Sequence, residues 1–400
     1  MLPNGWSFAA TEEYGEVCAG RQRSPHFTEG TLRPYLRVAN VFEGHIDTTD
    51  VLSMLFSEKE YKKYRLEKND ILLNEGQSVE LVGRPAMYKG TPEACCFQNT
   101  LVRFRPNEHV DPDFALQRFF LCFHDGTFQA IAKKTTSIAH LGVSRFAELK
   151  LSWPPLPEQK KISAILSTWD RAIEGTEKLL SNSQQQKKAL MQQLLTGKKR
   201  LPGFTGEWRI FSLSDVATVQ TATSKTQYIC ENGERFIVDM GSINRLGNLV
   251  CTKSTQHNAD LLPKGTLVMP KDDIGGGNII GRTSYIDQDD LYVLGDHVYA
   301  LHINDCDSKF LHFIINSYPI NKNLRRRANG TAQLGLGKKD VLRQKIKIPS
   351  EFHEQKAIAA VLTSADEEIT ALESDLTRLR QEKKALMQQL LTGKRRVTVD

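Results

Sequence analysis

In two stretches of the chain, mostly apolar residues recur at alternating intervals of four and three positions. In residues 156–199 these positions are Ile162, Leu166, Trp169, Ile173, Thr176, Leu180, Ser183, Lys187, Leu190 and Leu194. In residues 351–400 they are Ile358, Leu362, Ala365, Ile369, Leu372, Leu376, Leu379, Lys383, Leu386 and Leu390. These are the intervals of a coiled-coil seam, so the pattern predicts one long helix in each stretch. We call the two stretches the rods.

The rods repeat each other in sequence. Residues 158–198 and 354–394 are offset by 196 positions without a gap, and 23 of the 41 positions are identical. Gly197 and Gly393 stand where a left-handed residue would end each helix. A rod of about 39 residues would be about 58 Å long. This length and the narrow seam favour two rods packed on each other; the alternative is that each rod only packs into the core of its own domain.

The remaining segments, residues 1–155 and 200–350, alternate short apolar runs with turn residues. Gly, Asn, Asp and Pro bound six runs that predict strands: Tyr35–Val41, Asp70–Leu73, Thr100–Phe104, Phe236–Met240, Gly265–Met269 and His297–Ile303. Each segment also has one helical pattern, at about 113–123 and 308–317. We therefore predict two α+β globules with mixed or antiparallel sheets, each followed by a rod.

Composition narrows the functional class. No apolar run reaches the length of a membrane helix, and the first residues lack the basic start and apolar core of a secretory signal. The seven cysteines include no Cys-x-x-Cys pair, which argues against a disulfide framework or zinc ribbon and favours the cytoplasm. The net charge of +6 permits a nucleic-acid partner without requiring one.

No motif in the chain supports catalysis. Gly335–Lys339 lacks the first glycine and the hydroxyl residue of a phosphate-binding loop. Trp153–Leu156 contains two prolines but not the flanking residues of the amino-methyltransferase tetrad. The acidic pairs Asp272-Asp273 and Asp289-Asp290 are interpreted as solvated loop charges. We therefore expect no catalytic residue, no metal site and no cofactor bound by this chain.

Basic and amide side chains of the second globule are candidates for DNA contact. They are Arg325, Arg326, Arg327, Asn329, Gln333, Lys338 and Lys339, with Arg282 beside a glycine-rich loop. Arginine can bind phosphates and guanine edges, and Asn or Gln can pair with adenine. The alternative interpretation is a solvated run of charge.

The first globule offers a weaker set of candidates. Aligned backward from the rods, its counterpart of the arginine run contains Lys133, Lys134, His140 and Arg145. Arg21 and Arg23, near the N-terminus, are further candidates. Basic residues in such loops are often merely exposed.

Over its whole length the chain resembles the specificity subunit of type I restriction–modification systems. The resemblance rests on Pro154-Pro155-Leu156-Pro157-Glu158-Gln159, on Glu354-Gln355, and on the two Lys-Ala-Leu-Met-Gln-Gln-Leu-Leu-Thr-Gly-Lys rod ends. The set Gly330-Thr331-x-Gln333 followed by Ile348-Pro349 is similar to that family's exit from a target-recognition domain. The first globule lacks this set, and Ser350-Glu351-Phe352-His353 replaces the family's Pro-Pro-Leu before the second rod.

The resemblance implies two target-recognition domains, residues 1–155 and 200–350, separated by two long antiparallel helices in a pseudo-two-fold repeat. Each domain would read one half of a split sequence in double-stranded DNA, and the helices would set the spacing. Two methyltransferase subunits would dock on the helices, and restriction subunits would join them. The complex would use S-adenosylmethionine, ATP and magnesium through those other subunits. Two alternatives are a fused restriction or methylation enzyme and a coiled-coil scaffold that binds proteins only.

Overall fold

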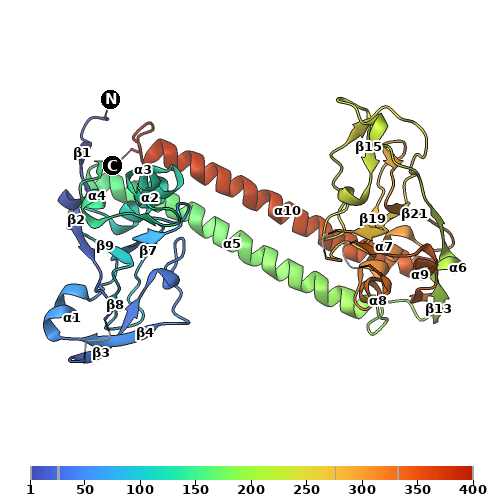
Figure 1. Cartoon of the computed structure of the whole chain (residues 1–400), viewed down its shortest axis with the longest axis horizontal. Coiled ribbons are helices and arrows are strands. Elements are labelled where there is room, and N and C mark those ends of the chain that lie inside the picture. The colour runs from blue at the N-terminus through green and yellow to red at the C-terminus, as the bar shows by residue number, and fades with distance from the viewer. Residues whose placement is uncertain (1, 25–27, 275, 331–332, 399–400) are drawn as a thin grey trace. The chain divides into compact units, whose positions relative to one another are not determined.

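The computed structural model describes residues 2–24, 28–274, 276–330 and 333–398 (Figure 1). The chain divides into two compact units. Unit 1 comprises Met1–Thr176 and Asp375–Asp400, and unit 2 comprises Glu177–Ser374. Each unit therefore contains one globule and a part of each rod. Both combine mainly antiparallel sheets with short helices, which confirms the predicted α+β class.

Unit 1 is built around a four-stranded antiparallel sheet. In spatial order its strands are β2 (Gly15–Ala19), β9 (Leu101–Pro106), β5 (Ile71–Asn74) and β7 (Pro85–Met87). One face packs on α2 (Pro112–His124), α3 (Thr127–Ile131) and α4 (Val143–Ala147). Alternate residues of a strand face opposite sides, so Ile71 and Leu73 lie in this cluster while Leu72 lies in a cluster on the other face.

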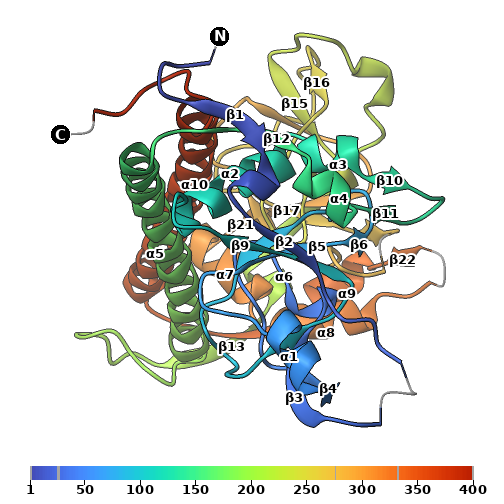
Figure 2. The ribbon, with the colours of Figure 1, turned by 90° about the vertical axis from the view of Figure 1, so that its left-hand side faces the viewer.

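Smaller sheets complete unit 1. On the second face lie β4 (Leu52–Phe56), β3 (Thr31–Leu36) and β8 (Cys96–Phe97), with α1 (Glu58–Tyr64) beside β3 and β4 (Figure 2). A hairpin of β10 (Lys133–Lys134) and β11 (Ala139–His140) pairs with β6 (Gly76–Gln77). β1 (Ser7–Ala10) pairs with β12 (Lys150–Trp153), which leads into the first rod. The buried Trp153 ring stacks on Tyr14 at 4.5 Å between centroids.

Unit 2 repeats this plan. Its central sheet is β14 (Ala217–Gln220), β21 (Val298–Ile303), β17 (Leu267–Pro270) and β19 (Ser284–Tyr285). The helices are α6 (Leu213–Val216), α7 (Ser308–Asn316), α8 (Ile320–Arg327) and α9 (Lys338–Leu342). A second sheet contains β16 (Ser254–Thr255), β15 (Arg235–Val238) and β20 (Tyr292–Leu294). The pairs β13 (Trp208–Ser212) with β23 (Lys345–Pro349), and β18 (Asp272–Asp273) with β22 (Leu334–Gly335), correspond to β1 with β12 and β6 with β11.

Five of the six predicted strands are present within about two residues, but the prediction for Tyr35–Val41 is wrong. Only its first two residues belong to β3, and Val38–Asn40 form a single 3-10 turn. The Asn40 side chain accepts from the Arg37 amide at 3.1 Å and donates to the Asp47 carbonyl at 3.0 Å. Such local side-chain hydrogen bonds compete with a strand ladder.

The rods are helices α5 (Leu156–Leu194) and α10 (Phe352–Leu390), each 39 residues long. Between Ile173 and Leu190 the side chains that escape full exposure are those at the predicted seam positions, and the same holds between Ile369 and Leu386. Gly197 and Gly393 have φ of 69° and 73°, which confirms the predicted left-handed ends.

In each unit the rods pair in antiparallel fashion. In unit 1 the Lys383 ammonium of α10 binds the Asp170 carboxylate of α5 at 2.6 Å. In unit 2 the same pair recurs with the helices exchanged, between Lys187 of α5 and Asp366 of α10. Each lysine also lies over a phenylalanine ring of its own unit. The polar seam positions therefore hold each rod pair and tie it to the adjacent globule.

Candidate nucleic-acid interface and helix anchors

Unit 2 has a cationic hollow of about 540 Å³. It lies between the glycine-rich loop that follows β18 and the helices α7 and α8. The basic residues that line it are Arg282, Lys322, Arg325 and Arg326. The structure thus brings together Arg282 and two members of the arginine run, which the sequence placed 43 positions apart. We call this feature the basic hollow.

Close backbone approach forms the walls of the basic hollow. Gly281 has φ of 70°, and a Cβ atom there would lie 2.9 Å from Leu324 of α8. The buried Asn321 side chain donates to the Gly281 carbonyl at 2.9 Å and fixes α8 to the loop. The Asp273 carboxylate accepts a hydrogen bond from the Ile279 amide at 2.8 Å, which links the two ends of the loop. Asp273 is only 2% exposed, so the interpretation of that acidic pair as solvated is wrong for this residue.

The three arginines of the run have different surroundings. Arg325 and Arg326 are exposed and line the basic hollow. Arg327 is half-buried, and its guanidinium donates to the Asp340 carbonyl at 3.0 Å, which joins α8 to α9. The geometry gives Arg327 a structural role and leaves Arg325 and Arg326 available to a ligand.

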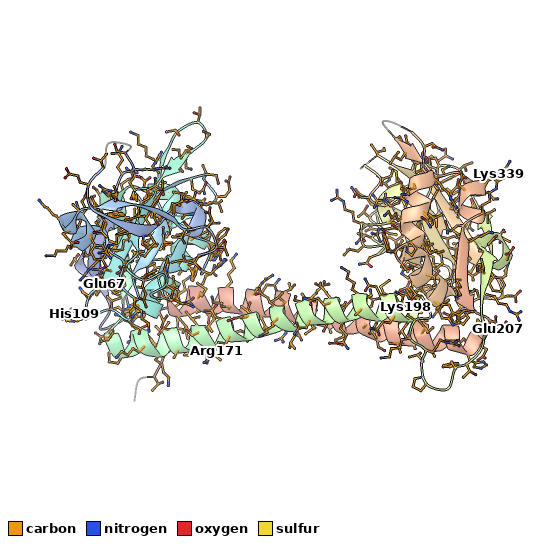
Figure 3. All side chains as sticks on the ribbon, turned by 90° about the horizontal axis from the view of Figure 1, so that it is seen from below. Glu67, His109, Arg171, Lys198, Glu207 and Lys339 are labelled. Atoms are coloured by element: carbon orange, nitrogen blue, oxygen red, sulfur yellow. The ribbon has the colours of Figure 1, made fainter. Side chains whose placement is uncertain are left out.

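The other candidates of unit 2 lie on the segment after α8. Asn329 and Gly335 exchange two backbone hydrogen bonds of 2.9 and 2.8 Å, which close a hairpin with the exposed Gln333 near its tip. Residues 331–332 lie outside the described residues. The Lys338 ammonium donates to the Val219 carbonyl at 2.9 Å, whereas Lys339 is exposed at the surface of unit 2 (Figure 3).

Four candidates of unit 1 lie on or beside the β10–β11 hairpin. Lys133 and Lys134 are exposed on β10. His140 lies 3.1 Å from the Glu75 carboxylate, and the Arg145 guanidinium donates to the His140 carbonyl at 2.7 Å. Strand pairing matches this hairpin with the Asn329–Gly335 hairpin of unit 2. The lysines therefore correspond to Asn329 and its neighbour, and not to the arginine run itself as we expected.

Arg21 does not belong to an exposed basic surface. Its side chain is 5% exposed, forms an ion pair with Glu60 at 2.8 Å, and packs over the Phe56 ring. Its expected role in DNA contact is corrected to a structural one, because a buried guanidinium paired with a carboxylate cannot reach a ligand. Arg23, two residues later, is exposed. Position near the N-terminus gave no indication of this difference.

The Glu-Gln pair that opens each rod has a function that sequence reasoning missed. Glu354, fully buried, accepts two hydrogen bonds from Arg200 at 2.5 and 2.6 Å. Glu158 accepts two from Arg396 at 2.7 and 2.9 Å. In each unit the start of one rod thus binds the segment that follows the other. The equal offsets, Glu158 to Glu354 and Arg200 to Arg396, are the signal that could have revealed the pairing.

The glutamines complete these anchors. Gln159 Oε1 accepts from the Asp111 amide at 2.9 Å, and Gln355 Oε1 accepts from the Asp307 amide at 2.8 Å. Asp111 and Asp307 are the N-cap residues of α2 and α7. Each glutamine also donates to the carbonyl of a proline before its rod. A rod therefore fixes the start of the main helix of its globule.

Comparison with known proteins agrees with this repeated architecture. The family model described as type I restriction modification DNA specificity domain matches residues 10–182 and again 205–379. The chain belongs to this specificity family. Two relatives from Methanocaldococcus jannaschii, named as the MjaX and MjaVIII specificity subunits of type I restriction enzymes, are 25% and 26% identical. Each alignment covers 99% of this chain, and 95% and 94% of the relatives.

Solved structures share the fold. The S subunit of a type I restriction–modification system from M. genitalium superposes with a TM-score of 0.62 at 15% identity, over 98% of both chains. Proteins of the specificity family are recognition subunits without catalytic activity. Within the described residues no group of three or more His, Cys, Asp or Glu side chains could hold a metal ion. None of the described helices combines the length and apolar character that a bilayer crossing demands.

Proposed function

We propose that each unit of this DNA sequence-specificity subunit reads one half of a bipartite target in double-stranded DNA. The observation that carries the proposal is that the same fold occurs twice on equivalent rods, while the exposed candidate DNA-contact residues differ between the two units. Unit 2 presents the basic hollow and Gln333; unit 1 presents Lys133 and Lys134 on the matching hairpin. A shared scaffold that carries different contact residues in each unit suits two different half-sites.

Repeated surface residues on the rods are the basis for proposing that two copies of the methyltransferase subunit dock there. Exposed side chains recur unchanged on α5 and α10 or just beyond them, among them Lys188 and Lys384, Ala189 and Ala385, Gln192 and Gln388, Gln193 and Gln389, and Lys198 and Lys394. Figure 3 shows Lys198 at the surface of unit 2. Across the described part of the chain, none of these ten side chains forms a hydrogen bond or ion pair. Two equal surfaces favour two equal partners.

Chemistry would then come from the partners. Neither unit offers a described catalytic cluster, so the methyltransferase subunits would bind S-adenosylmethionine and the restriction subunits would use ATP and magnesium. This chain would bind no cofactor of its own. Its contribution would be to choose the site and hold the catalytic subunits there.

The test is methylome sequencing of a host without restriction systems that carries this chain and its cognate methyltransferase. We expect a split motif with modified adenines in both halves. Absence of new methylation, although the complex has been isolated intact, would contradict the proposal and favour a scaffold that binds proteins only.

A longer rod pair should lengthen the gap in the target. Inserting one seam-compatible heptad after Glu177 and another after Glu373 adds about 10.5 Å to each helix, or about three base pairs. Because seven residues keep the seam in register, both half-sites should stay unchanged while the gap grows. Methylome sequencing measures the gap directly. A two-residue insertion at the same places is the control, since it turns the seam by about 200° to the opposite side of the helix and should abolish methylation. An unchanged gap with the heptads would refute the spacing role.

A further inference from the structure

The basic hollow is an unbalanced cluster of charge. Four cationic side chains line it, and none of its described lining residues is acidic. Arg282, Arg325 and Arg326 form no ion pair with any described carboxylate, whereas arginines elsewhere in unit 2, such as Arg200 and Arg209, do. A concave cationic surface of this kind concentrates the electrostatic field.

The arginines of the basic hollow repel one another in the free protein. Burial and the nearby Arg325 charge both lower the pKa of Arg282, which reflects the crowding of positive charge in the hollow. The contacts of Gly281 and Asn321 with Leu324 and the loop hold the backbone that carries Arg282 close to the backbone of α8 that carries Arg325 and Arg326. Binding of an anion would relieve this repulsion.

We propose that the basic hollow seats backbone phosphates of one DNA strand, next to the half-site that unit 2 reads. This rests on the proposed function and names the ligand group at that surface. A guanine edge offers two acceptors to one arginine, and four cations exceed that need. Successive phosphates each carry a full charge, which matches a cluster of cations. The hollow therefore positions the DNA, and Asn329 and Gln333 beside it remain for base contact.

Among its described residues, unit 1 has no matching anchor. Arg84, the counterpart of Arg282 in the repeated Gly-Arg pair, donates to the Val41 carbonyl at 2.5 Å and packs over the Phe42 ring. The positions that match Arg325–Arg327 are Gln129, Ala130 and Ile131. The second unit thus carries the more salt-dependent share of binding.

The proposal is tested on the full chain in complex with its methyltransferase. A labelled duplex with the complete target is titrated at several salt concentrations, with wild type and with the double variant Arg325→Gln/Arg326→Gln. Each lost phosphate contact reduces the slope of log K against log salt by about 0.9, so we expect a slope lower by about 2. Affinity should fall by roughly tenfold for each arginine. The double variant should bind duplexes altered in the second half-site more weakly than the wild type does, by the same factor as for the complete target. The ratio of the two affinities, which measures specificity, should therefore stay unchanged.

The control is Arg209→Gln, which removes an exposed arginine of the same unit outside the hollow and should leave the slope unchanged. Because Arg325 and Arg326 are exposed, the double variant should unfold at the wild-type temperature. An unchanged slope with a collapsed specificity ratio would assign the arginines to base reading and overturn the proposal. Lack of sequence-specific binding by the wild-type complex would instead refute the proposed function itself.

A free nucleotide carries the same phosphate chemistry as DNA. ATP added at constant ionic strength should leave the affinity of the wild-type complex for DNA unchanged. Competition by ATP that disappears in Arg325→Gln/Arg326→Gln would assign the hollow to a free nucleotide and overturn the proposal.

Discussion

Replacing residues 200–350 with the equivalent segment of another specificity subunit should change one half of the methylated sequence and leave the other half intact. The segment enters through β13 and leaves through β23, and these strands pair from Trp208 with Pro349 to Ser212 with Lys345. The two junctions therefore lie side by side, outside the central sheet. The buried core of unit 2 is contiguous in sequence apart from its rod residues, so it is transferred nearly whole.

The exchange is measured by methylome sequencing, with an equivalent exchange of residues 1–155 as the matched control. That control should change the opposite half. If either exchange altered both halves, or altered only the gap, independent reading by the two units would be refuted. Retained expression of an assembled complex separates this outcome from a folding failure.

Glu354→Gln should destabilise unit 2 by about 2–4 kcal/mol. The carboxylate is fully buried, and its two bonds from Arg200 hold the start of α10 to the segment after α5. Removing one partner of a buried pair strands the remaining charge, although Arg200, with its side chain 27% exposed, recovers part of its hydration. For a unit of this size the melting temperature should fall by about 5–12 °C.

Thermal unfolding of the full chain measures this effect, with Glu207→Gln as control. Glu207 forms an ion pair with Arg209, but both side chains are well exposed, so its loss should cost at most about 0.5 kcal/mol. Glu158→Gln should have a smaller effect than Glu354→Gln, because its partner Arg396 is 45% exposed. Equal stability of Glu354→Gln and Glu207→Gln would contradict the anchoring role.

The rods were predictable because their determinants are local and periodic. The seam intervals and the end glycines specify a helix and its bounds, and the structure follows them. The strand predicted at Tyr35–Val41 failed because one polar side chain, Asn40, satisfies the backbone instead of a neighbouring strand. Helix α8 was not predicted: it has eight residues and only two of them are buried, too few to show a period.

The candidate site was predictable only in its residue types. The sequence singled out Arg282 and the arginine run, but their convergence depends on a loop closed by Asp273 and on the approach of Gly281 to α8. Arg21 and Arg23 were indistinguishable in sequence, since burial of the first depends on Glu60 and Phe56, more than thirty positions away. Charge in a sequence indicates capacity to bind, and the fold decides which charges are used internally.

Unit 1 consists of two separate segments of the chain, and this determines when it can fold during synthesis on the ribosome. Its core includes Met387, Leu390 and Leu391 together with Trp153 and Ile162. Between Thr176 and those last residues the ribosome must add about 210 more, which takes roughly 10–40 s at typical elongation rates. Unit 2 is one uninterrupted segment and emerges complete in the meantime. Unit 1 is thus begun first and completed last. Until the end of α10 has been made, the apolar face that it covers in unit 1 is exposed and open to contact with other nascent chains.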